Sequence, residues 1–545
     1  MRRLLVANRG EIALRVFRAC RAEGVETVAV VAPDDTSSLH ARSADATVAI
    51  ESYLDAAEHV RAALETDADA VHPGYGFLAE SAEFAEAVLA GGLTWVGPPP
   101  AALRAGGDKL AAKAAARAAG VPVLPDGTPD QVGFPLLLKA AAGGGGRGMR
   151  VVRAPGELED ALAAARREAL AAFGDDSIFC ERYVERPRHV EIQLLADRLG
   201  GVVALGEREC SVQRRHQKVL EESPSTALDP ALRAAMSDAA VAFARAIGYE
   251  SAGTAEFLLD GRDFFFLELN ARIQVEHPVT ELVTGLDLVA EQLRIARGER
   301  LSSHVRRSRQ DGHAVEVRLY AEDPVSFLPQ AGRLERLRLP AEIRVDAGVE
   351  EGDEIGTSYD PMIAKLVAHA PTRGAALDRL AAALRETGVA GVTTNLTFLR
   401  WLVSHPLVRA GATTTAFLAE NPPLTEPPAQ APAPAWRGAW RLNLPQPPPR
   451  PAPDADATAR EHGPAAEQST VTAPMPGTVV KVLVAAGDRV AARAPLVVLE
   501  AMKMETPLVS PYDATVRAVH VAEGDRIAGG AARGELVAMA NKLPG

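Results

Sequence analysis

The stretch Leu267-Glu268-Leu269-Asn270-Ala271-Arg272-Ile273-Gln274-Val275-Glu276 alternates apolar and polar residues without a break. Alternate side chains of an extended chain point to opposite faces, so all five polar groups would share one face of a strand. Carboxylate and amide oxygens are hard ligands that suit Mg²⁺, and an arginine among them can hold a small anion. A half-exposed strand with a solvated face is the alternative, but such faces seldom combine these residue types without lysine or threonine. The stretch therefore predicts a strand that binds a metal and an anion.

The residues around this stretch extend the prediction to a mixed α/β block. Residues 255–259 form another apolar strand, and its Glu256 would offer a further ligand across a hairpin. More β-rich segments lie at residues 190–195 and 201–206, among helical segments. Residues from about 108 to 299 are therefore expected to form one block that mixes helices with β-rich stretches.

A glycine-rich segment precedes these strands. It reads Lys139-Ala140-Ala141-Ala142-Gly143-Gly144-Gly145-Gly146-Arg147-Gly148-Met149 and follows an apolar strand at residues 135–138. Consecutive glycines let backbone N–H groups wrap around phosphate oxygens, and the flanking lysine and arginine add positive charge. The segment is not a Walker A loop, which needs Gly-Lys-Ser/Thr before a helix. A flexible linker is the alternative, but the close flanking strands favour a phosphate-binding loop.

Charge is unusually dense in residues 207–218, Glu-Arg-Glu-Cys-Ser-Val-Gln-Arg-Arg-His-Gln-Lys. The run is consistent with a solvated loop and equally with recognition of a nucleotide and an anion. Cys210 within it is more typical of packing than of a nucleophile.

The first hundred residues alternate strand-like and helix-like segments. An amphipathic helix is predicted before Gly24, at residues 11–23. Strands are predicted at residues 4–7, 26–32, 70–72 and 94–96. This βαβ rhythm is typical of a doubly wound sheet. Asn8-Arg9-Gly10-Glu11 lies where a strand meets a helix, and its single glycine leaves an ordinary turn and a phosphate site equally open.

A proline-rich segment separates the last part of the chain from the rest. Residues from about 312 to 419 combine several strands with a helix at 373–386. Of the 39 prolines, 13 lie between residues 420 and 468. Polyproline II and coil are the expected states there, and a flexible segment of this length would span on the order of 40 Å. Trp436 and Trp440 lie inside it and would either anchor a docking partner or pack on a neighbouring domain.

The final segment contains an internal repeat. Thr478-Val479 and Gly487-Asp488-Arg489-Val490 recur 37 positions later as Thr515-Val516 and Gly524-Asp525-Arg526-Ile527. Two similar β-halves predict a small sandwich or flattened barrel. The two copies differ at Lys503, whose counterpart in the second copy is Ala540. Lys503 lies within the segment Glu500-Ala501-Met502-Lys503-Met504-Glu505. A lysine at the predicted hairpin tip, between soft apolar methionines, suits a post-translationally attached prosthetic group.

Composition restricts the class of protein. The 545 residues are enough for roughly three to four domains, and 47% hydrophobic with 24% charged residues is typical of a globular protein with large cores. The net charge of −12 argues against a nucleic-acid binder with a basic surface. No apolar run reaches the roughly 18 residues of a membrane span. Cys20, Cys180 and Cys210 lie far apart, which excludes a disulfide scaffold and fits a reducing cytoplasm.

Together these motifs resemble the biotin carboxylase family fused to a biotin carboxyl carrier domain, as in acetyl- and propionyl-type acyl-CoA carboxylase alpha subunits. The glycine-rich segment resembles the phosphate-covering loop of ATP-grasp enzymes, and Met-Lys-Met resembles biotinyl domains rather than lipoyl domains, which usually have an acidic residue before the lysine. The resemblance extends over residues 1 to about 419 and the tail. It includes Ala7-Asn8-Arg9-Gly10-Glu11-Ile12, His72-Pro73-Gly74-Tyr75-Gly76-Phe77-Leu78 and Gly312-His313-Ala314-Val315-Glu316-Val317-Arg318.

The resemblance implies an α/β multidomain fold. A doubly wound N-terminal domain at residues 1–107, an ATP-grasp domain at 108–311 and an α+β C-terminal carboxylase domain at 312–419 would come first. A Pro/Ala-rich linker at 420–468 and an all-β biotinyl domain at 469–541 would follow. Many fused relatives carry a folded docking domain before the biotinyl domain, where this chain has only the linker.

The implied reaction is ATP-dependent carboxylation of carrier-bound biotin by bicarbonate through carboxyphosphate. Carried over residue by residue, Glu276 would deprotonate bicarbonate, Lys218 would touch phosphate, and Arg318 would stabilise the biotin enolate. Bicarbonate would be held by Arg272, Gln274 and the Val275 backbone. Lys503 would carry biotin.

The resemblance also implies ligands for the metal and the nucleotide. The implied Mg²⁺ (or Mn²⁺) ligands are Glu256, Glu268 and Asn270. The implied ATP contacts are Lys109, Lys139, Gly143, Gly144, Gly145, Gly146, Met149, Glu181, Val184, His189, Gln213, His216 and Leu258.

Partners follow from the same resemblance. Carboxybiotin would pass to a separate carboxyltransferase beta subunit, and a biotin protein ligase would modify Lys503. A homodimer or larger complex in the cytoplasm is expected, with no contact to nucleic acid or membrane. Three alternatives stay open: service to another acceptor such as pyruvate, a biotin carrier and scaffold without catalysis, and another ATP-grasp ligase, which Lys503 disfavours.

Overall fold

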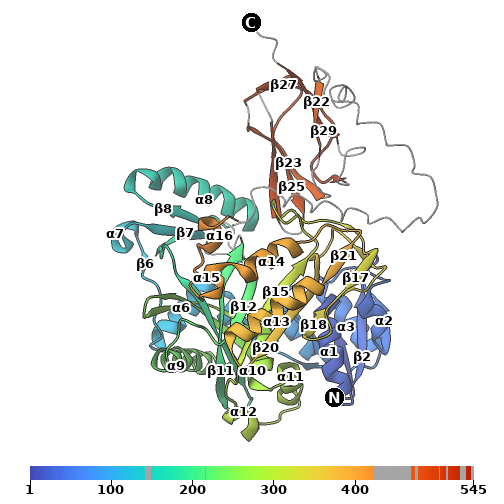
Figure 1. Ribbon diagram of the computed structural model, residues 1–545, viewed down its shortest axis with the longest axis vertical. Coiled ribbons are helices and arrows are strands. Elements are labelled where there is room, and N and C mark those ends of the chain that lie inside the picture. The colour runs from blue at the N-terminus through green and yellow to red at the C-terminus, as the bar shows by residue number, and fades with distance from the viewer. Residues whose placement is uncertain are drawn as a thin grey trace, which may run out of the picture.

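The computed structural model describes residues 1–140, 149–173, 175–214, 217–422, 468–472, 477–491, 493–501, 504–510, 513–527 and 535–541. The chain forms a large α/β body and a small all-β unit near the C-terminus (Figure 1). Most of the glycine-rich segment, His216, the proline-rich segment with Trp436 and Trp440, and Lys503 lie outside the described residues. Within the described ranges, none of the helices has both the length and the apolar character needed to cross a membrane.

The N-terminal residues form a five-stranded parallel sheet in the order β3-β2-β1-β4-β5. Its strands are β1 (Arg3–Val6), β2 (Glu26–Val31), β3 (Ala46–Ala49), β4 (Ala70–His72) and β5 (Thr94–Trp95). The chain starts at the centre of the sheet and proceeds first to one edge and then to the other, so the sheet is doubly wound as predicted. Only β3 was not predicted. The helices are α1 (Gly10–Ala22), α2 (Leu39–Ser43), α3 (Ala56–Glu65), α4 (Ala82–Ala90) and α5 (Pro100–Gly107).

The end of α1 agrees with the expected glycine stop. Gly24 has a φ of +67°, in the left-handed region that glycine adopts without strain. The buried face of α1 contains Ile12, Val16 and Phe17, which pack in one core with the N-terminal strands.

A small four-stranded sheet follows, in the order β6-β9-β7-β8. Its strands are β6 (Asp126–Gly127), β7 (Leu136–Ala140), β8 (Arg150–Val152) and β9 (Ile178–Arg182), and its helices are α6 (Lys109–Ala118), α7 (Pro129–Val132) and α8 (Leu158–Phe173). β7 confirms the strand predicted before the glycines, and it pairs antiparallel with β8 on the other side of them. Leu136, Leu138 and Val152 form a core with Ala165 of α8, which lies over this sheet (Figure 1).

The largest sheet has eight antiparallel strands in the order β14-β13-β10-β11-β12-β15-β20-β18. Its strands are β10 (Arg188–Ala196), β11 (Val202–Arg214), β12 (Gln217–Ser223), β13 (Ser251–Asp260), β14 (Asp263–Asn270), β15 (His313–Tyr320), β18 (Arg344–Ala347) and β20 (Met362–Ala370). β12 pairs with β15, so the expected ATP-grasp and C-terminal blocks contribute strands to one continuous sheet. Short pairs join β16 (Gly332–Arg333) to β19 (Glu354–Ile355) and β17 (Arg336–Arg338) to β21 (Gly388–Ala390).

Helices accompany this sheet (Figure 1). They are α9 (Pro230–Ala246), α10 (His277–Thr284), α11 (Leu288–Ala296), α12 (Ser303–Arg307), α13 (Arg373–Glu386), α14 (Leu396–Ser404), α15 (Pro406–Arg409) and α16 (Phe417–Glu420). α13 has the predicted bounds. The Thr372 side chain accepts from the backbone of Ala375 and so caps its start.

The structure corrects the prediction of one strand from Glu268 to Glu276. β14 ends at Asn270, and α10 begins at His277, so the residues between them are not in a strand. Pro278 in the first turn of α10 favours a helix start there, and Glu276 occupies the position before the helix. The polar residues of the stretch still gather at one place, but by a turn of the chain rather than by alternation.

The C-terminal unit consists of two four-stranded antiparallel sheets, in the orders β22-β29-β27-β24 and β26-β25-β23-β28. Their strands are β22 (Gln468–Thr472), β23 (Gly477–Val482), β24 (Arg489–Val490), β25 (Pro495–Ala501), β26 (Met504–Val509), β27 (Ala514–Val519), β28 (Arg526–Ile527) and β29 (Glu535–Asn541). The repeat relates β23 to β27, and its equivalent residues Val479 and Val516 share one buried core. The predicted sandwich of two similar halves is confirmed.

Candidate active site

The site is centred on Lys218, on β12. Its ammonium group donates to three buried carboxylates: Glu256 at 2.7 Å, Glu276 at 2.6 Å and Glu191 at 2.5 Å. Burial opposes the charged form of Lys218, but these carboxylates outweigh burial and raise its pKa well above the usual range. Lys218 is therefore a fixed positive charge in the middle of the large sheet.

Glu276 is held between two cations. One oxygen accepts from Lys218, and the other accepts from Nη2 of Arg318, on β15, at 3.0 Å. Burial disfavours ionisation of Glu276, but the charges of Lys218 and Arg318 outweigh it and lower its pKa. The carboxylate is therefore ionised at neutral pH although it is shut off from bulk water.

Glu256 accepts hydrogen bonds from polar residues of β14 and of the turn after it. One of its oxygens accepts from Asn270 at 2.8 Å and from Gln274 at 2.9 Å, in addition to Lys218. Its other oxygen lies 3.0 Å from Nε2 of His189, on β10. Burial opposes the charge of Glu256, but Lys218 and His189 outweigh it and lower its pKa well below the usual range.

Glu268 lies opposite Glu256 on the neighbouring strand, and Asn270 lies opposite Thr254. Burial and the negative charge of Glu256 raise the pKa of Glu268, as expected for two adjacent carboxylates. Two carboxylates and an amide oxygen that share one side of a hairpin form a donor set for a hard divalent cation. The residues present therefore fit Mg²⁺.

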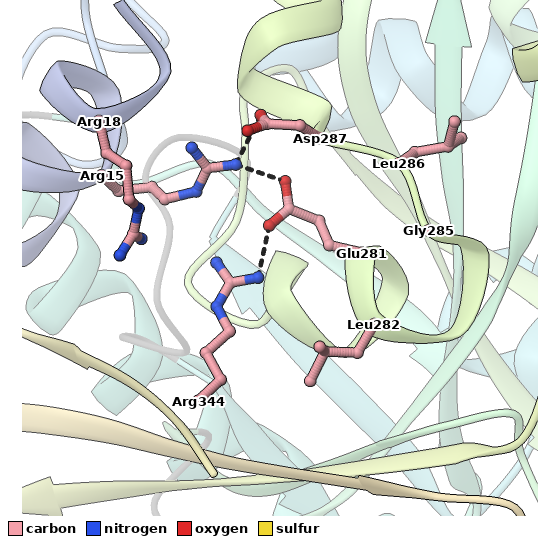
Figure 2. A pocket seen from close by; sticks show the side chains of 8 residues that line it. All are labelled: Arg15, Arg18, Glu281, Leu282, Gly285, Leu286, Asp287 and Arg344. Atoms are coloured by element: carbon pink, nitrogen blue, oxygen red, sulfur yellow. Dashed lines mark hydrogen bonds and ion pairs between the residues drawn. The ribbon is translucent and has the colours of Figure 1, made fainter. Parts of the chain in front are cut away.

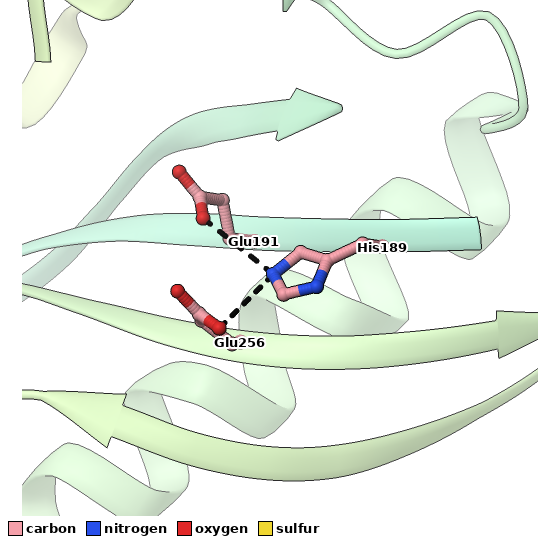
Figure 3. A group of neighbouring side chains, drawn as sticks. All are labelled: His189, Glu191 and Glu256. Carbon is pink, nitrogen blue, oxygen red and sulfur yellow. Dashed lines mark ion pairs between the residues drawn. The ribbon is translucent and has the colours of Figure 1, made fainter. Parts of the chain in front are cut away.

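A second potential metal group includes Glu256. His189, Glu191 and Glu256 place one ligand atom each within 4.8 Å of one another (Figure 3). The imidazole nitrogen of His189 points between the two carboxylates, which come from the adjacent strands β10 and β13 (Figure 3). The imidazole nitrogen makes this group better suited to a transition metal such as Zn²⁺ or Fe²⁺ than the all-oxygen group is.

The turn after β14 is fixed from several sides. Arg272 donates to Oδ1 of Asn270 at 2.9 Å and lies 3.1 Å from Glu80, in the N-terminal part of the chain. Oε1 of Gln274 accepts from Arg208 at 2.7 Å. The carbonyl of Val275 accepts from Lys365 at 2.9 Å. The three residues expected to hold bicarbonate are therefore neighbours of the Lys218 cluster, which consists of Lys218 and the carboxylates of Glu191, Glu256 and Glu276.

The expected nucleotide contacts are less closely grouped. Lys139 of β7 forms an ion pair with Glu181 of β9 at 2.5 Å, and Lys113 of α6 also contacts Glu181. The positive charge of Lys109, at the start of α6, adds to burial in lowering the pKa of Lys139 and opposes the burial that raises the pKa of Glu268.

The other predicted nucleotide residues lie on or beside the strands. Leu258 is opposite His189 in the β10–β13 pair, and Gln213 is opposite Lys218 in the β11–β12 pair. Val184 lies just beyond β9, and Met149 directly precedes β8. Gly143, Gly144, Gly145, Gly146 and His216 lie outside the described residues.

The charge-dense run is largely strand. Residues 207–214 belong to β11, where Glu207, Arg208 and Glu209 are buried, so the solvated-loop interpretation is wrong for this part. Burial raises the pKa of the Cys210 thiol well above its usual range, so the thiol stays protonated. This agrees with the expectation that Cys210 is not a nucleophile.

Four charged residues of the site had no individual role predicted from the sequence, although one of them, Arg208, lies in the charge-dense run: Glu191, Arg208, Glu221 and Lys365. Arg208 is fully buried and donates to Glu191, Gln193, Thr254, Gln274 and Thr280. Glu221 lies 2.5 Å from Arg318. A signal for Glu191 was present, because His189, Glu191 and Gln193 alternate with apolar residues along one strand.

The predicted biotin site is bracketed by described strands. Ala501, at the end of β25, pairs with Met504, at the start of the antiparallel strand β26. Lys503 itself lies outside the described residues.

Family models match the chain along most of its length. They are described as biotin carboxylase, N-terminal domain (residues 1–103), carbamoyl-phosphate synthase L chain, ATP binding domain (108–304), biotin carboxylase C-terminal domain (316–420) and biotin-requiring enzyme (469–532).

Individual relatives agree with these matches. The propionyl-CoA carboxylase alpha chain of Ruegeria pomeroyi is 46% identical over 77% of this chain and 68% of its own length. The mitochondrial methylcrotonoyl-CoA carboxylase subunit alpha of Oryza sativa subsp. japonica is 47% identical over 76% of this chain and 60% of its own. A crystal structure of a biotin carboxylase–βγ-ATP complex from Campylobacter jejuni has a TM-score of 0.75 and 39% identity over 77% of this chain and 98% of that one. The chain thus matches about two thirds of the length of these curated relatives.

Proposed function

The chain belongs to the biotin carboxylase family, and on that premise we propose how its residues perform the ATP-dependent carboxylation of biotin by bicarbonate. The observation that carries the proposal is the position of Glu276 between Lys218 and Arg318. A carboxylate held by two cations beside a polar turn can receive an anion and take its proton.

Bicarbonate would bind to Arg272, Gln274 and the backbone at Val275. Proximity to the Lys218 cluster supports this assignment, because all three residues contact members or neighbours of that cluster. An anion that attracts Lys218 or Arg318 away from Glu276 would raise the pKa of Glu276. Glu276 would thereby become a stronger base when the substrate to be deprotonated is in place.

Phosphoryl transfer would follow deprotonation. The bicarbonate oxygen attacks the γ-phosphorus of ATP, the bond to the β-phosphate oxygen breaks, and ADP and carboxyphosphate result. Lys109, Lys139 and the glycines at 143–146 would hold the ATP phosphates, with Met149, Glu181, Val184, His189, Gln213, His216 and Leu258 around the rest of the nucleotide. Glu256, Glu268 and Asn270 would hold Mg²⁺, which neutralises phosphate charge when bound.

Carboxyl transfer to biotin would involve Arg318. Carboxyphosphate breaks into CO₂ and phosphate, phosphate takes the proton from N1 of biotin, and N1 attacks CO₂. Negative charge develops on the ureido oxygen, and an arginine stabilises it because arginine does not lose its own proton. Lys218 would bind the phosphate, and biotin would be attached to Lys503, in the domain matched by the biotin-requiring enzyme model.

The larger assembly is also a proposal. We infer the alpha subunit of an acyl-CoA carboxylase, because the curated relatives carry such names. The carboxyl group would then pass to a separate carboxyltransferase beta subunit, and a biotin protein ligase would modify Lys503. Domains at 1–107, 108–311, 312–419 and 469–541, with a linker at 420–468, would form a cytoplasmic homodimer or larger complex. The three cysteines, all free and buried in the structure, support a reducing compartment.

Bicarbonate-dependent ATP hydrolysis tests the proposal. The purified full chain with Mg²⁺ is expected to release phosphate from ATP only when bicarbonate is present, and faster with free biotin. A folded sample that binds ATP but shows no such dependence would favour a biotin carrier without catalysis. Assays of a co-purified carboxyltransferase with acetyl-CoA, propionyl-CoA and pyruvate would identify the acceptor.

A further inference from the structure

Lys365 is a fully buried lysine in an otherwise apolar stretch of β20, Met-Ile-Ala-Lys-Leu-Val-Ala. An unpaired ammonium group in such a place costs several kcal/mol, so its partners matter for the fold. Among the described residues to which the proposed reaction assigns chemistry, Lys365 contacts the backbone of Val275 and no other.

Its ammonium group joins three parts of the chain. Nζ donates to the carbonyl of Val275 at 2.9 Å, before α10. Oε2 of Glu11, on α1, lies at 3.1 Å, and Oδ2 of Asp346, on β18, lies at 3.9 Å. Lys365 therefore connects the N-terminal helix, the turn after β14 and the C-terminal strands.

The bond to Val275 has a direct geometric consequence. The carbonyl of Val275 and the N–H of Glu276 belong to one planar peptide unit, so fixing the first orients the second. In the part of the chain that the structure describes, the turn pairs with no strand that would fix this peptide. A second bond acts one residue earlier, where the ring nitrogen Nδ1 of His277 lies 2.7 Å from the carbonyl of Gln274.

Glu11 is itself fixed on the side away from Lys365. The hydroxyl of Tyr75 donates to its other oxygen. The C-terminal part approaches the backbone so closely that a Cβ at Gly348 would lie 2.8 Å from the nitrogen of Glu11. Glu11 and Tyr75 belong to the two N-terminal motifs, residues 7–12 and 72–78, for which the proposed reaction gives no role.

Asp346 also pairs with two cations other than Lys365. Arg344 donates to it at 2.8 Å and Arg18 at 2.7 Å. Both arginines line a surface cavity of about 420 Å³, where Arg344 and Arg15 also bind Glu281 (Figure 2). Of the two carboxylates beside Lys365, Glu11 at 3.1 Å is the nearer, and Asp346 has other cations that remain if Lys365 is replaced.

We propose that Lys365 is a positioning residue for carboxylation, which clamps the Val275 peptide so that Gln274 and Glu276 meet bicarbonate in the correct orientation. This inference rests on the proposed function. The clamp acts on the bicarbonate turn and not on the expected nucleotide contacts. Its loss should therefore weaken the use of bicarbonate far more than the use of ATP.

Kinetics of bicarbonate-dependent ATP hydrolysis test the clamp in two variants of the full chain. Lys365→Met removes the donor but leaves Glu11 as a buried unpaired carboxylate. Lys365→Met/Glu11→Gln keeps the charge balanced and preserves an acceptor for Tyr75. In both variants KM for bicarbonate is expected to rise about tenfold or more, because small misplacements of substrate-binding groups are costly. KM for ATP should stay within about twofold of wild type.

Arg373→Met is the matched control. Arg373 also binds a buried glutamate, Glu222, and two backbone carbonyls, but none of them in the turn after β14. The Arg373→Met substitution should leave the ratio of KM for bicarbonate to KM for ATP unchanged from the wild type. Folded Lys365 variants with wild-type KM for bicarbonate, or a failure of both to fold, would overturn the clamp in favour of a purely structural lysine. Absence of bicarbonate-dependent hydrolysis in the wild type would instead overturn the proposed function.

Discussion

Nζ of Lys218 lies 2.6 Å from Oε1 of Glu276, while the other oxygen of the same carboxylate accepts from Arg318 at 3.0 Å. The two cations that hold the proposed base are thus the two expected to hold phosphate and the biotin enolate. Under the proposed function, phosphate and biotin would compete with Glu276 for these cations. Binding would therefore release the base, which couples proton removal to occupancy of the site.

Glu276→Gln tests the base directly. The amide has almost the same shape but cannot accept a proton, so bicarbonate-dependent ATP hydrolysis should fall by about 10²–10⁴-fold. ATP affinity, measured by equilibrium binding, should change little because Glu276 is not among the expected nucleotide contacts. Turnover near the wild-type rate would remove Glu276 as the base.

Lys503→Ala is expected to abolish recognition of the chain by avidin after co-expression with a biotin ligase. The reason is the position of Lys503 between paired strands in the domain matched by the biotin-requiring enzyme model. Lys481→Ala is the control, since Lys481 is an exposed lysine on β23 of the same unit. Labelling that persists in Lys503→Ala would place biotin on another lysine.

Glu221 should make stability depend on pH. Burial raises its pKa to about 7, with the neighbouring Glu276 adding to burial and Arg318 opposing it. The folded state then keeps a proton on Glu221 that the unfolded state has already lost. The contribution of this proton to stability is therefore present at acidic pH and is lost as pH rises towards about 7. The change is on the order of 3 kcal/mol. The thermal unfolding midpoint of Glu221→Gln should therefore fall less between about pH 5 and about pH 8 than the midpoint of the wild type does.

The adjacent Glu222 supplies a control of opposite sign. Burial opposes its charge, but His313 and Arg373 outweigh burial and lower its pKa. Its contribution is present at neutral pH and is lost on acidification. Glu222→Gln should therefore destabilise the protein more at pH 8 than under acidic conditions, at about pH 4. Identical pH profiles for the two variants would contradict the assigned charge states.

Arg208→Met should destabilise the α/β body by about 3–5 kcal/mol, because it leaves Glu191 and several buried acceptors without their donor. Urea unfolding followed by tryptophan fluorescence measures the change. Arg198→Met is the control, since the Arg198 side chain is 44% exposed and its pair with Glu250 is an ordinary surface ion pair. Equal effects of the two substitutions would refute a central role for Arg208.

Local patterns predicted the parts of the fold that depend on local sequence. The helix predicted at residues 373–386 and the strand–helix alternation near Gly24 lie where expected, because caps and periodicity determine them. The 37-residue repeat likewise predicted a sandwich whose two sheets are equivalent. The alternation argument failed beyond Asn270, where a turn replaces the strand and α10 begins at His277, with Pro278 in its first turn.

The site residues that the sequence patterns did not predict form hydrogen bonds to residues elsewhere in the chain. Lys365 binds a carbonyl 90 positions earlier in the chain, and no local signal at either residue reveals the other. Arg208 similarly donates hydrogen bonds to side chains of β10, β13 and α10. Glu191 was accessible to the same alternation argument that selected Glu268, since it shares its strand with His189.

Transfer of radiolabel from bicarbonate to the carrier tests the central claim most directly. The biotinylated full chain is incubated with Mg²⁺, ATP and labelled bicarbonate, then freed of small molecules at mildly alkaline pH and counted. The account predicts label on the wild-type chain that requires ATP and is absent from Lys503→Ala and from Glu276→Gln. A biotinylated wild-type chain that binds ATP but acquires no label, or label that persists in Lys503→Ala, would contradict it.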